Sequence, residues 1–185
     1  MKDYVIPNGN EREFIENAEK LNIKELMFLY PLTKFDATNL EMLQNGTKIR
    51  LLKAVIADKK DMHVAKRKAF DAVRALEENR AILEQGPDLM FGFEEASKKD
   101  YLHHRGSGFN QVLAKIAHDK KVSIGLSFSS LIRADSVSRA QIIGRMNQNK
   151  MLFRKYKVKF FVASFAERPE EMRAAEELKA FERVV

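Results

Sequence analysis

Residues 103–128, HHRGSGFNQVLAKIAHDKKVSIGLSF, join a basic glycine turn, an amphipathic helix and an apolar strand. Ser107 is expected to cap the helix, because a serine hydroxyl can accept the free amide hydrogens of a first helical turn. Five apolar side chains then follow at helical spacing and predict one face packed on a core: Phe109, Val112, Leu113, Ile116 and Ala117. The apolar run VSIGLSF, which begins at Val122, predicts a buried strand directly after this helix.

The same alternation of strand and helix runs along the whole chain. Strands are expected at residues 4–6, 24–30, 49–57, 69–74, 88–93, 122–128 and 159–165, with helices between them. Runs such as LMFLY and FFVASF are continuously apolar, as strands of a parallel sheet covered on both faces must be. The sequence therefore predicts an α/β fold, and seven units favour a TIM-like (β/α) barrel. Because a complete eight-unit barrel typically needs about 250 residues, we expect seven strands or an incomplete barrel.

Composition points to one soluble domain. A chain of 185 residues with 45% hydrophobic content can bury one continuous core, so residues 1–185 are expected to form a single domain. The sequence has no cysteine, which excludes disulfides and thiolate chemistry. Apolar runs such as LMFLYPL, from Leu26, are too short to cross a bilayer, and Met1-Lys2-Asp3 begins no signal peptide. We expect a cytoplasmic protein without a membrane partner.

The positive charge is grouped along the sequence. The net charge of +7 arises from three blocks: residues 48–68 hold eight Lys/Arg and two acids, residues 98–121 six and two, and residues 133–159 eight and one. Such grouping is expected if one face of the fold meets phosphate. Any single block could also be an ordinary solvated helix face. The three blocks together favour a polyanionic partner.

Catalytic patterns are weak in this sequence. The four histidines, His63, His103, His104 and His118, fall in connections or on the outside of a helix, where they cannot gather at strand ends around a metal. Residues 106–108, Gly-Ser-Gly, lack the length and the lysine of a Walker A loop. Backbone amides at this turn could still hold a single phosphate beside Arg105. We therefore expect no catalytic residue and no metal site.

Two helices carry polar surfaces that could bind a partner. Gln111, Lys115 and His118 are spaced at i, i+4 and i+7, so they form an outer stripe on the first helix. An exposed helix needs some polar surface in any case. A second, long helix is expected over residues 135–157, beginning at Asp135 or Ser136, with five basic side chains around its surface: Arg139, Arg145, Lys150, Arg154 and Lys157.

The segment RGSGFNQVLAKIAH, from Arg105, resembles the signature block of the archaeal and eukaryotic ribonuclease P protein component 3 family. The shared features are the arginine, the serine-glycine turn and the V-L-A-K-[IL]-A helix. Upstream, FDAVRALEENRAILEQGPDLMFGF is similar to the strand, short helix and strand of that family. Downstream, SRAQIIGRM and FRKYKVKFFVAS follow the family order. The similarity covers residues 69–165.

This resemblance implies a barrel related to the polymerase-and-histidinol-phosphatase enzymes and a non-catalytic subunit of ribonuclease P, the endoribonuclease that removes the 5′ leader of precursor tRNA. The RNA subunit and its Mg²⁺ would perform the chemistry, and this chain would bind no cofactor. The implied partners are ribonuclease P RNA, protein component 2 and, through the holoenzyme, precursor tRNA. Positions that match the family or flank its signature helix are candidates for RNA binding: Arg80, Arg105, Lys115, His118 and Arg139.

Two alternatives remain open from the sequence. One is a metal-dependent phosphoesterase of the related barrel superfamily, whose members carry His-x-His just after the first strand. Residues 6–10 read IPNGN here and contain no histidine, which argues against it. The other is a (β/α) barrel protein without RNA function, whose basic blocks only aid solubility. Metal content would test the first alternative, and binding to structured RNA would test the second.

Overall fold

The computed structural model describes residues 2–35, 40–75, 78–95, 100 and 105–185. Within them the chain forms parallel strands whose order in the sheet is their order in the sequence. The strands are β1 Lys2–Val5, β2 Glu25–Pro31, β3 Arg50–Ile56, β4 Asp71–Arg74, β5 Leu89–Phe91, β6 Ser123–Ser127 and β7 Phe160–Ala163. All seven strands predicted from the sequence are therefore present.

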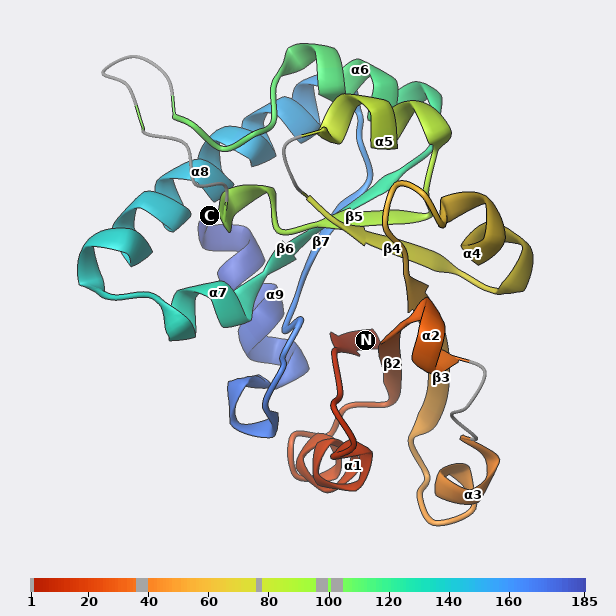
Figure 1. The fold of residues 1–185 in the computed structure, drawn as a ribbon. Helices are drawn as coiled ribbons and strands as arrows, with labels where there is room; N and C mark the ends of the chain where they lie inside the picture. The colour runs from red at the N-terminus through yellow and green to blue at the C-terminus, as the bar shows by residue number, and fades with distance from the viewer. Residues whose placement is uncertain (1, 36–39, 76–77, 96–99, 101–104) are drawn as a thin grey trace.

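Helices surround the strands on the outside (Figure 1). They are α1 Glu11–Lys20, α2 Leu32–Phe35, α3 Glu41–Gln44, α4 Met62–Lys68, α5 Asn79–Gln85, α6 Gln111–Asp119, α7 Phe128–Arg133, α8 Ser136–Tyr156 and α9 Ala175–Val184. Two short 3₁₀ segments follow strands, η1 Phe93–Glu95 after β5 and η2 Pro169–Glu171 after β7. Of the two candidate caps of the long helix α8, Asp135 and Ser136, the cap is Asp135, whose carboxylate accepts hydrogen bonds from the backbone amides of Val137 and Ser138.

The sheet closes almost completely on itself. Just beyond β7, Ala166 pairs in parallel with Val5 of β1, and the amide of Ile6 donates to the carbonyl of Ala166 at 2.7 Å. The amide of Ser164 donates to the carboxylate of Asp3 at 2.7 Å and joins the same two strands. Seven parallel strands thus form a nearly closed barrel, and the predicted TIM-like α/β fold is confirmed.

Side chains fill the interior of the barrel. Successive residues of a strand point to opposite faces, so Met27 and Leu29 of β2 face inward while Phe28 packs outward under the helices. The interior is a separate apolar cluster made of Tyr4, Met27, Leu29, Ala54, Ala72, Leu89, Phe91, Ala163 and Phe165. The barrel is therefore a packed core and not a pore.

Phe165 packs in the interior against a glycine. Its ring stacks on Phe91 with centroids 4.5 Å apart and planes at 6°. A Cβ atom added to Gly125 of β6 would lie 2.4 Å from Cζ of Phe165. A side chain at position 125 would therefore displace this ring, and glycine is required by the close approach.

The start of α6 differs from the sequence prediction. Asn110, not Ser107, caps the helix, because its side-chain oxygen accepts the amides of Val112 and Leu113 at 2.9 and 3.1 Å. Ser107 is buried and donates to Oδ1 of Asn149 in α8 at 2.7 Å. Val112, which was predicted to be in the core, is 47% exposed, since the packed face is centred on Leu113.

Two basic residues of α8 are also not where the sequence placed them. Arg145 and Lys150 were predicted on the surface, but their exposed fractions are 6% and 4%. The guanidinium of Arg145 donates to Oδ1 of Asp100 at 2.9 Å, and Nζ of Lys150 donates to the carbonyl of Glu182 in α9. The prediction was wrong because α6, α7 and η1 pack against α8, and the backbone at the end of the chain reaches Lys150.

Candidate functional site

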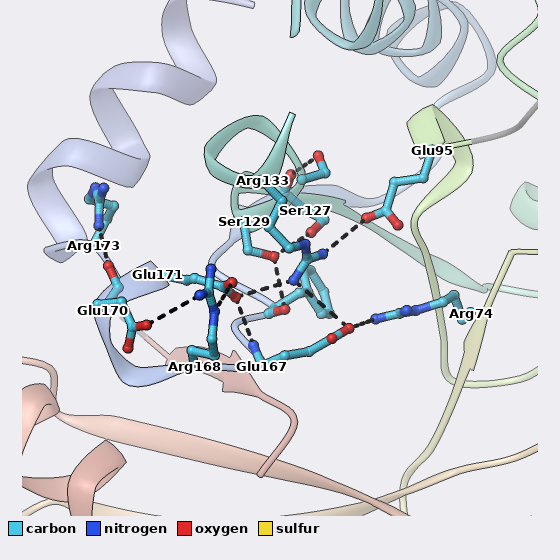
Figure 2. Close-up of polar contacts among 12 residues, drawn as sticks. Arg74, Glu95, Ser127, Ser129, Arg133, Glu167, Arg168, Glu170, Glu171 and Arg173 are labelled. Atoms are coloured by element: carbon cyan, nitrogen blue, oxygen red, sulfur yellow. Dashed lines mark hydrogen bonds and ion pairs between the residues drawn. The ribbon is translucent and has the colours of Figure 1, made fainter. Parts of the chain in front are cut away.

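The carboxyl ends of the strands are where TIM-barrel enzymes place their active sites. In this chain that end carries a network of ion pairs (Figure 2). Arg74, at the end of β4, contacts Glu167 at 2.6 Å. Arg133 of α7 reaches Glu171 at 3.1 Å and Glu167 at 3.8 Å. Side chains from three separate segments are thus joined across the opening of the barrel.

Each carboxylate in this network has several partners. Glu171 is fully buried, binds Nε of Arg168 at 2.9 Å and accepts the backbone amide of Glu167 at 3.0 Å. Partial burial alone would raise the pKa of Glu167, but the ion pairs with Arg74 and Arg133 outweigh it and hold this pKa below its usual value. Both carboxylates are thus engaged by partners within the chain.

The guanidinium of Arg74 also closes the barrel over its aromatic interior. Its Cζ lies 5.5 Å from the ring centroid of Phe91, which in turn stacks on Phe165. Ion pairs therefore sit directly above a packed apolar core. This arrangement contributes to the stability of the fold at the end where enzymes of this fold bind substrate.

A second acid at this end is buried below the surface. Glu94 of η1 is fully buried, and burial raises its pKa to about 8 although the amide of Ser127 donates to its Oε1 at 2.6 Å. Glu94 is therefore mostly protonated at neutral pH. The hydrogen bond from Ser127 to Glu94 connects the segment after β5 to the start of α7.

Asp100 joins the glycine turn to α8. Its Oδ1 accepts the amide of Gly106 at 2.8 Å and Nε of Arg145 at 2.9 Å, while Oδ2 pairs with Arg105 at 3.3 Å. Although burial would raise the pKa of Asp100, these donors lower it. The sequence suggested that amides of this turn could hold a phosphate. The amide of Gly106 is not free to do so, because it donates to Asp100.

Arg105, a predicted RNA-binding residue, lies against α8. Its side chain is 46% exposed, and its guanidinium rests on Gly144, where an added Cβ would come within 2.4 Å of Cζ. The backbone amide of Arg105 donates to the side chain of Gln148 at 3.0 Å. Arg105 is thus both exposed and held in place, which suits a fixed contact to a partner.

Lys115 and His118 lie on the exposed face of α6, as predicted. Gln111, the third member of this stripe, accepts a hydrogen bond from the hydroxyl of Tyr156 at 3.3 Å. Nδ1 of His118 lies 3.2 Å from the carbonyl of Lys157, in the turn before β7. The stripe therefore runs along α6 to the end of the barrel at which the strands begin.

Arg80 and Arg139 have partners within the chain. Arg80 of α5 is exposed and pairs with Glu84 one turn later at 2.9 Å, which is a weak surface ion pair. Arg139 donates through Nε to the carbonyl of Leu131 at 2.8 Å and through Nη2 to that of Ala134 at 2.9 Å. Arg139 therefore closes the carboxyl end of α7, a structural role that the sequence did not predict.

The fold brings only some of the predicted residues together. Helix α6 packs against both α5 and α8, so Arg80, Lys115 and His118 lie on neighbouring helices, and Arg105 precedes α6 and contacts α8 (Figure 1). Arg139 contacts α7 instead. His103 and His104 lie outside the described residues.

Sequence patterns alone did not identify the ion-pair network. Its signal is the run ERPEEMR, residues 167–173, which follows β7 and mixes both charges. Its partners Arg74 and Arg133 are far away in the sequence.

Among the residues that the structure describes, no group of three or more His, Asp or Glu side chains is placed to hold a metal ion. In the same part of the chain, no helix combines the length and apolar character needed to cross a membrane.

The fold and this site define a class of protein: a seven-stranded TIM-like barrel whose catalytic end is closed by packing and ion pairs. The chain is similar to ribonuclease P protein component 3 of several archaea. It is 33% identical to that of Thermococcus kodakarensis over 100 residues, and 29% identical to that of Methanocaldococcus jannaschii over 103 residues. These matches cover 54% and 56% of this chain and 42% of each relative. The resemblance seen in the signature segment is therefore confirmed.

The match extends over about two fifths of the length of these relatives. The chain matches no protein-family model. In three dimensions it resembles a chain in the structure of archaeal ribonuclease P with mature tRNA, with a TM-score of 0.80 and 22% identity over 98% of this chain and 81% of that one. An uncharacterised protein shares the fold at a TM-score of 0.60 and 8% identity, over 100% of this chain and 69% of the other.

Proposed function

We propose that this chain is a non-catalytic protein subunit of ribonuclease P, which binds and stabilises the catalytic RNA during removal of the 5′ leader from precursor tRNA. The observation that carries the proposal is the similarity to component 3 of several archaea over about half of the chain. The likeness of almost the whole fold to a chain of archaeal ribonuclease P supports it. So does the net charge of +7.

In this role the basic side chains contact phosphates and release the counterions that surround the RNA, which favours its folded form. The RNA subunit and its Mg²⁺ perform the cleavage, and this chain needs no cofactor of its own. Its partners are ribonuclease P RNA, protein component 2 and, within the holoenzyme, precursor tRNA. The protein works in the cytoplasm. The closed catalytic end of the barrel supports a binding role over an enzymatic one.

Reconstitution tests this proposal. Ribonuclease P RNA and component 2 are combined with this chain, and cleavage of precursor tRNA at the mature 5′ end is followed across a series of Mg²⁺ concentrations. We expect the chain to lower the Mg²⁺ concentration required for cleavage. The matched control replaces it with an unrelated protein of similar net charge. An unchanged Mg²⁺ requirement would contradict the proposal, and cleavage by the RNA-free protein would favour the phosphoesterase alternative.

A further inference from the structure

The two ends of the barrel differ in charge. At the carboxyl ends of the strands, Glu95, Glu167 and Glu171 engage the arginines in ion pairs. At the opposite end, where the strands begin, basic residues predominate. The three basic blocks of the sequence do not show this difference, because it depends on which turns share an end of the barrel.

All strands of a parallel barrel begin at the same end, so the residues that lead into them gather there. Six of the seven strands begin at, or closely follow, Lys or Arg, whereas β5 follows Asp88. The first residues of β2 and β4 are acids, Glu25 and Asp71. We define the basic rim as Lys2, Lys24, Lys48, Arg50, Lys66, Arg67, Lys68, Lys120, Lys121, Lys157 and Lys159. These residues span nearly the whole chain, and only the fold brings them to one end.

Much of the charge on the basic rim is not neutralised within the chain. Arg50 pairs with Glu25 at 3.4 Å, and Lys66 donates to the carbonyl of Gln85. Four exposed lysines form no ion pair or side-chain hydrogen bond with any described residue: Lys24, Lys48, Lys121 and Lys157. Like charges gathered without partners repel one another and destabilise the folded state. An external polyanion would remove this repulsion.

Two of these lysines occupy unfavourable backbone positions. The turns after α1, α6 and α8 have the same geometry, in which the amides of Ile23, Val122 and Val158 donate to carbonyls five residues earlier at 2.9 Å. The residue before each of these amides is left-handed: Asn22 with φ of 55°, Lys121 with 58° and Lys157 with 56°. This position favours glycine or asparagine.

The turn after α5 provides the comparison. There the left-handed residue is Gly86, with φ of 66°. The strand that follows is β5, which has no Lys or Arg at or just before its first residue. The left-handed conformation costs little at Gly86 and Asn22. At Lys121 and Lys157 the backbone is strained, and each lysine adds a positive charge to the basic rim. Backbone strain maintained in this way is typical of functional positions.

The basic rim has a shape and composition suited to phosphate. A surface hollow beside it is lined by Lys24, Thr47 and Lys48, from the turns before β2 and β3, and by Glu19 of α1, whose carboxylate accepts a hydrogen bond from the Thr47 hydroxyl. The large apolar side chains exposed in the described residues lie outside the rim: Met42, Val112, Val137, Met151 and Val184. A protein partner usually needs an apolar centre in its interface, whereas an RNA backbone needs only donors and positive charge.

We propose that the basic rim, at the amino-terminal end of the barrel strands, is the surface on which the phosphate backbone of folded RNA docks. This inference rests on the proposed function and names the face that performs it. The stripe on α6 extends the same surface, because His118 contacts the backbone of Lys157 at the rim. The opposite end of the barrel faces away from the RNA.

The test uses the full chain with component 2 and measures binding to ribonuclease P RNA at several salt concentrations. In the double variant Lys121→Gly/Lys157→Gly, we expect affinity at low salt to fall roughly tenfold for each lysine and the salt slope to decrease by about two. The melting temperature should not fall, since glycine relieves the left-handed strain. A second double variant, Lys24→Ala/Lys48→Ala, samples the other side of the rim and should also lose affinity.

The matched control is Lys60→Ala/Lys179→Ala, which removes two exposed charges from outside the rim. We expect it to bind RNA like the unchanged protein. If all three double variants lose affinity equally, binding follows net charge and the rim inference is wrong. Tighter competition by polyglutamate than by unrelated structured RNA would also overturn it in favour of an acidic protein. If the unchanged protein does not bind ribonuclease P RNA, the proposed function itself fails.

Discussion

The contact between Gly125 and Phe165 makes a quantitative prediction about the barrel core. In Gly125→Ala, the new Cβ would lie 2.4 Å from Cζ of Phe165, whereas ordinary contacts begin near 3.4 Å. The ring would have to move by about 1 Å, but it stacks on Phe91 at 4.5 Å, and Cβ of Phe91 would itself lie 3.2 Å from the new atom. Overpacking of this kind costs about 1–3 kcal/mol. For a domain of this size, 2 kcal/mol lowers the melting temperature by about 4–8 °C.

A double-mutant cycle tests whether this contact is the cause. Phe165→Ala alone removes a fully buried ring and should cost about 3–5 kcal/mol. In that background Gly125→Ala should cost much less than in the unchanged protein, because the clash with the ring is gone and only the 3.2 Å approach to Cβ of Phe91 remains. The assay is urea unfolding followed by circular dichroism. Gly46→Ala, whose added Cβ would meet only one backbone oxygen at 3.6 Å, is the matched control and should change little. If the effects at positions 125 and 165 add to within about 0.5 kcal/mol, the two residues are not coupled and the reasoning fails.

Two further predictions concern pH and the candidate RNA-binding residues. Burial raises the pKa of Glu94 to about 8 from its ordinary 4.5, so between these values the folded state holds a proton that the unfolded state has lost, and stability should fall as pH rises. Glu94→Gln should reduce this fall in urea midpoints measured from pH 5 to 8.5, and an unchanged profile would show that Glu94 is not its source. Lys115→Ala should weaken RNA binding roughly tenfold with unchanged stability. Arg139→Ala should instead lower the free energy of unfolding by about 1 kcal/mol, because the carbonyls of Leu131 and Ala134 lose their donor. Equal effects of the two substitutions on unfolding would contradict these assignments.

Local patterns were sufficient for the elements but not for their ends or their buried polar contacts. The cap of α6 was assigned to Ser107 instead of Asn110, because both residue types favour that position and the sequence does not show which one is buried. Arg145 and Lys150 fit the solvent-facing pattern of an isolated helix. They are buried because segments distant in the sequence cover them.

For the candidate site, the sequence predicted which side chains are exposed but not all of their contacts. Lys115 and His118 were placed correctly on the surface, because the apolar face of α6 determines which side faces solvent. Arg139 is also exposed, and it donates to the carbonyls of Leu131 and Ala134, a contact that the sequence did not predict. RNA binding by the five candidate residues stays a prediction.

The sequence by itself determined the order of seven strands and their intervening helices, and with it the barrel, since apolar periodicity acts over a few neighbouring residues. Only the tertiary structure decided that Val5 meets Ala166 to close the sheet, and that Phe165 fills the interior against Gly125. It also decided that lysines from most of the chain lie at one end of the barrel while the other end is occupied by paired acids. These features depend on contacts between residues far apart in the sequence, which local patterns do not encode.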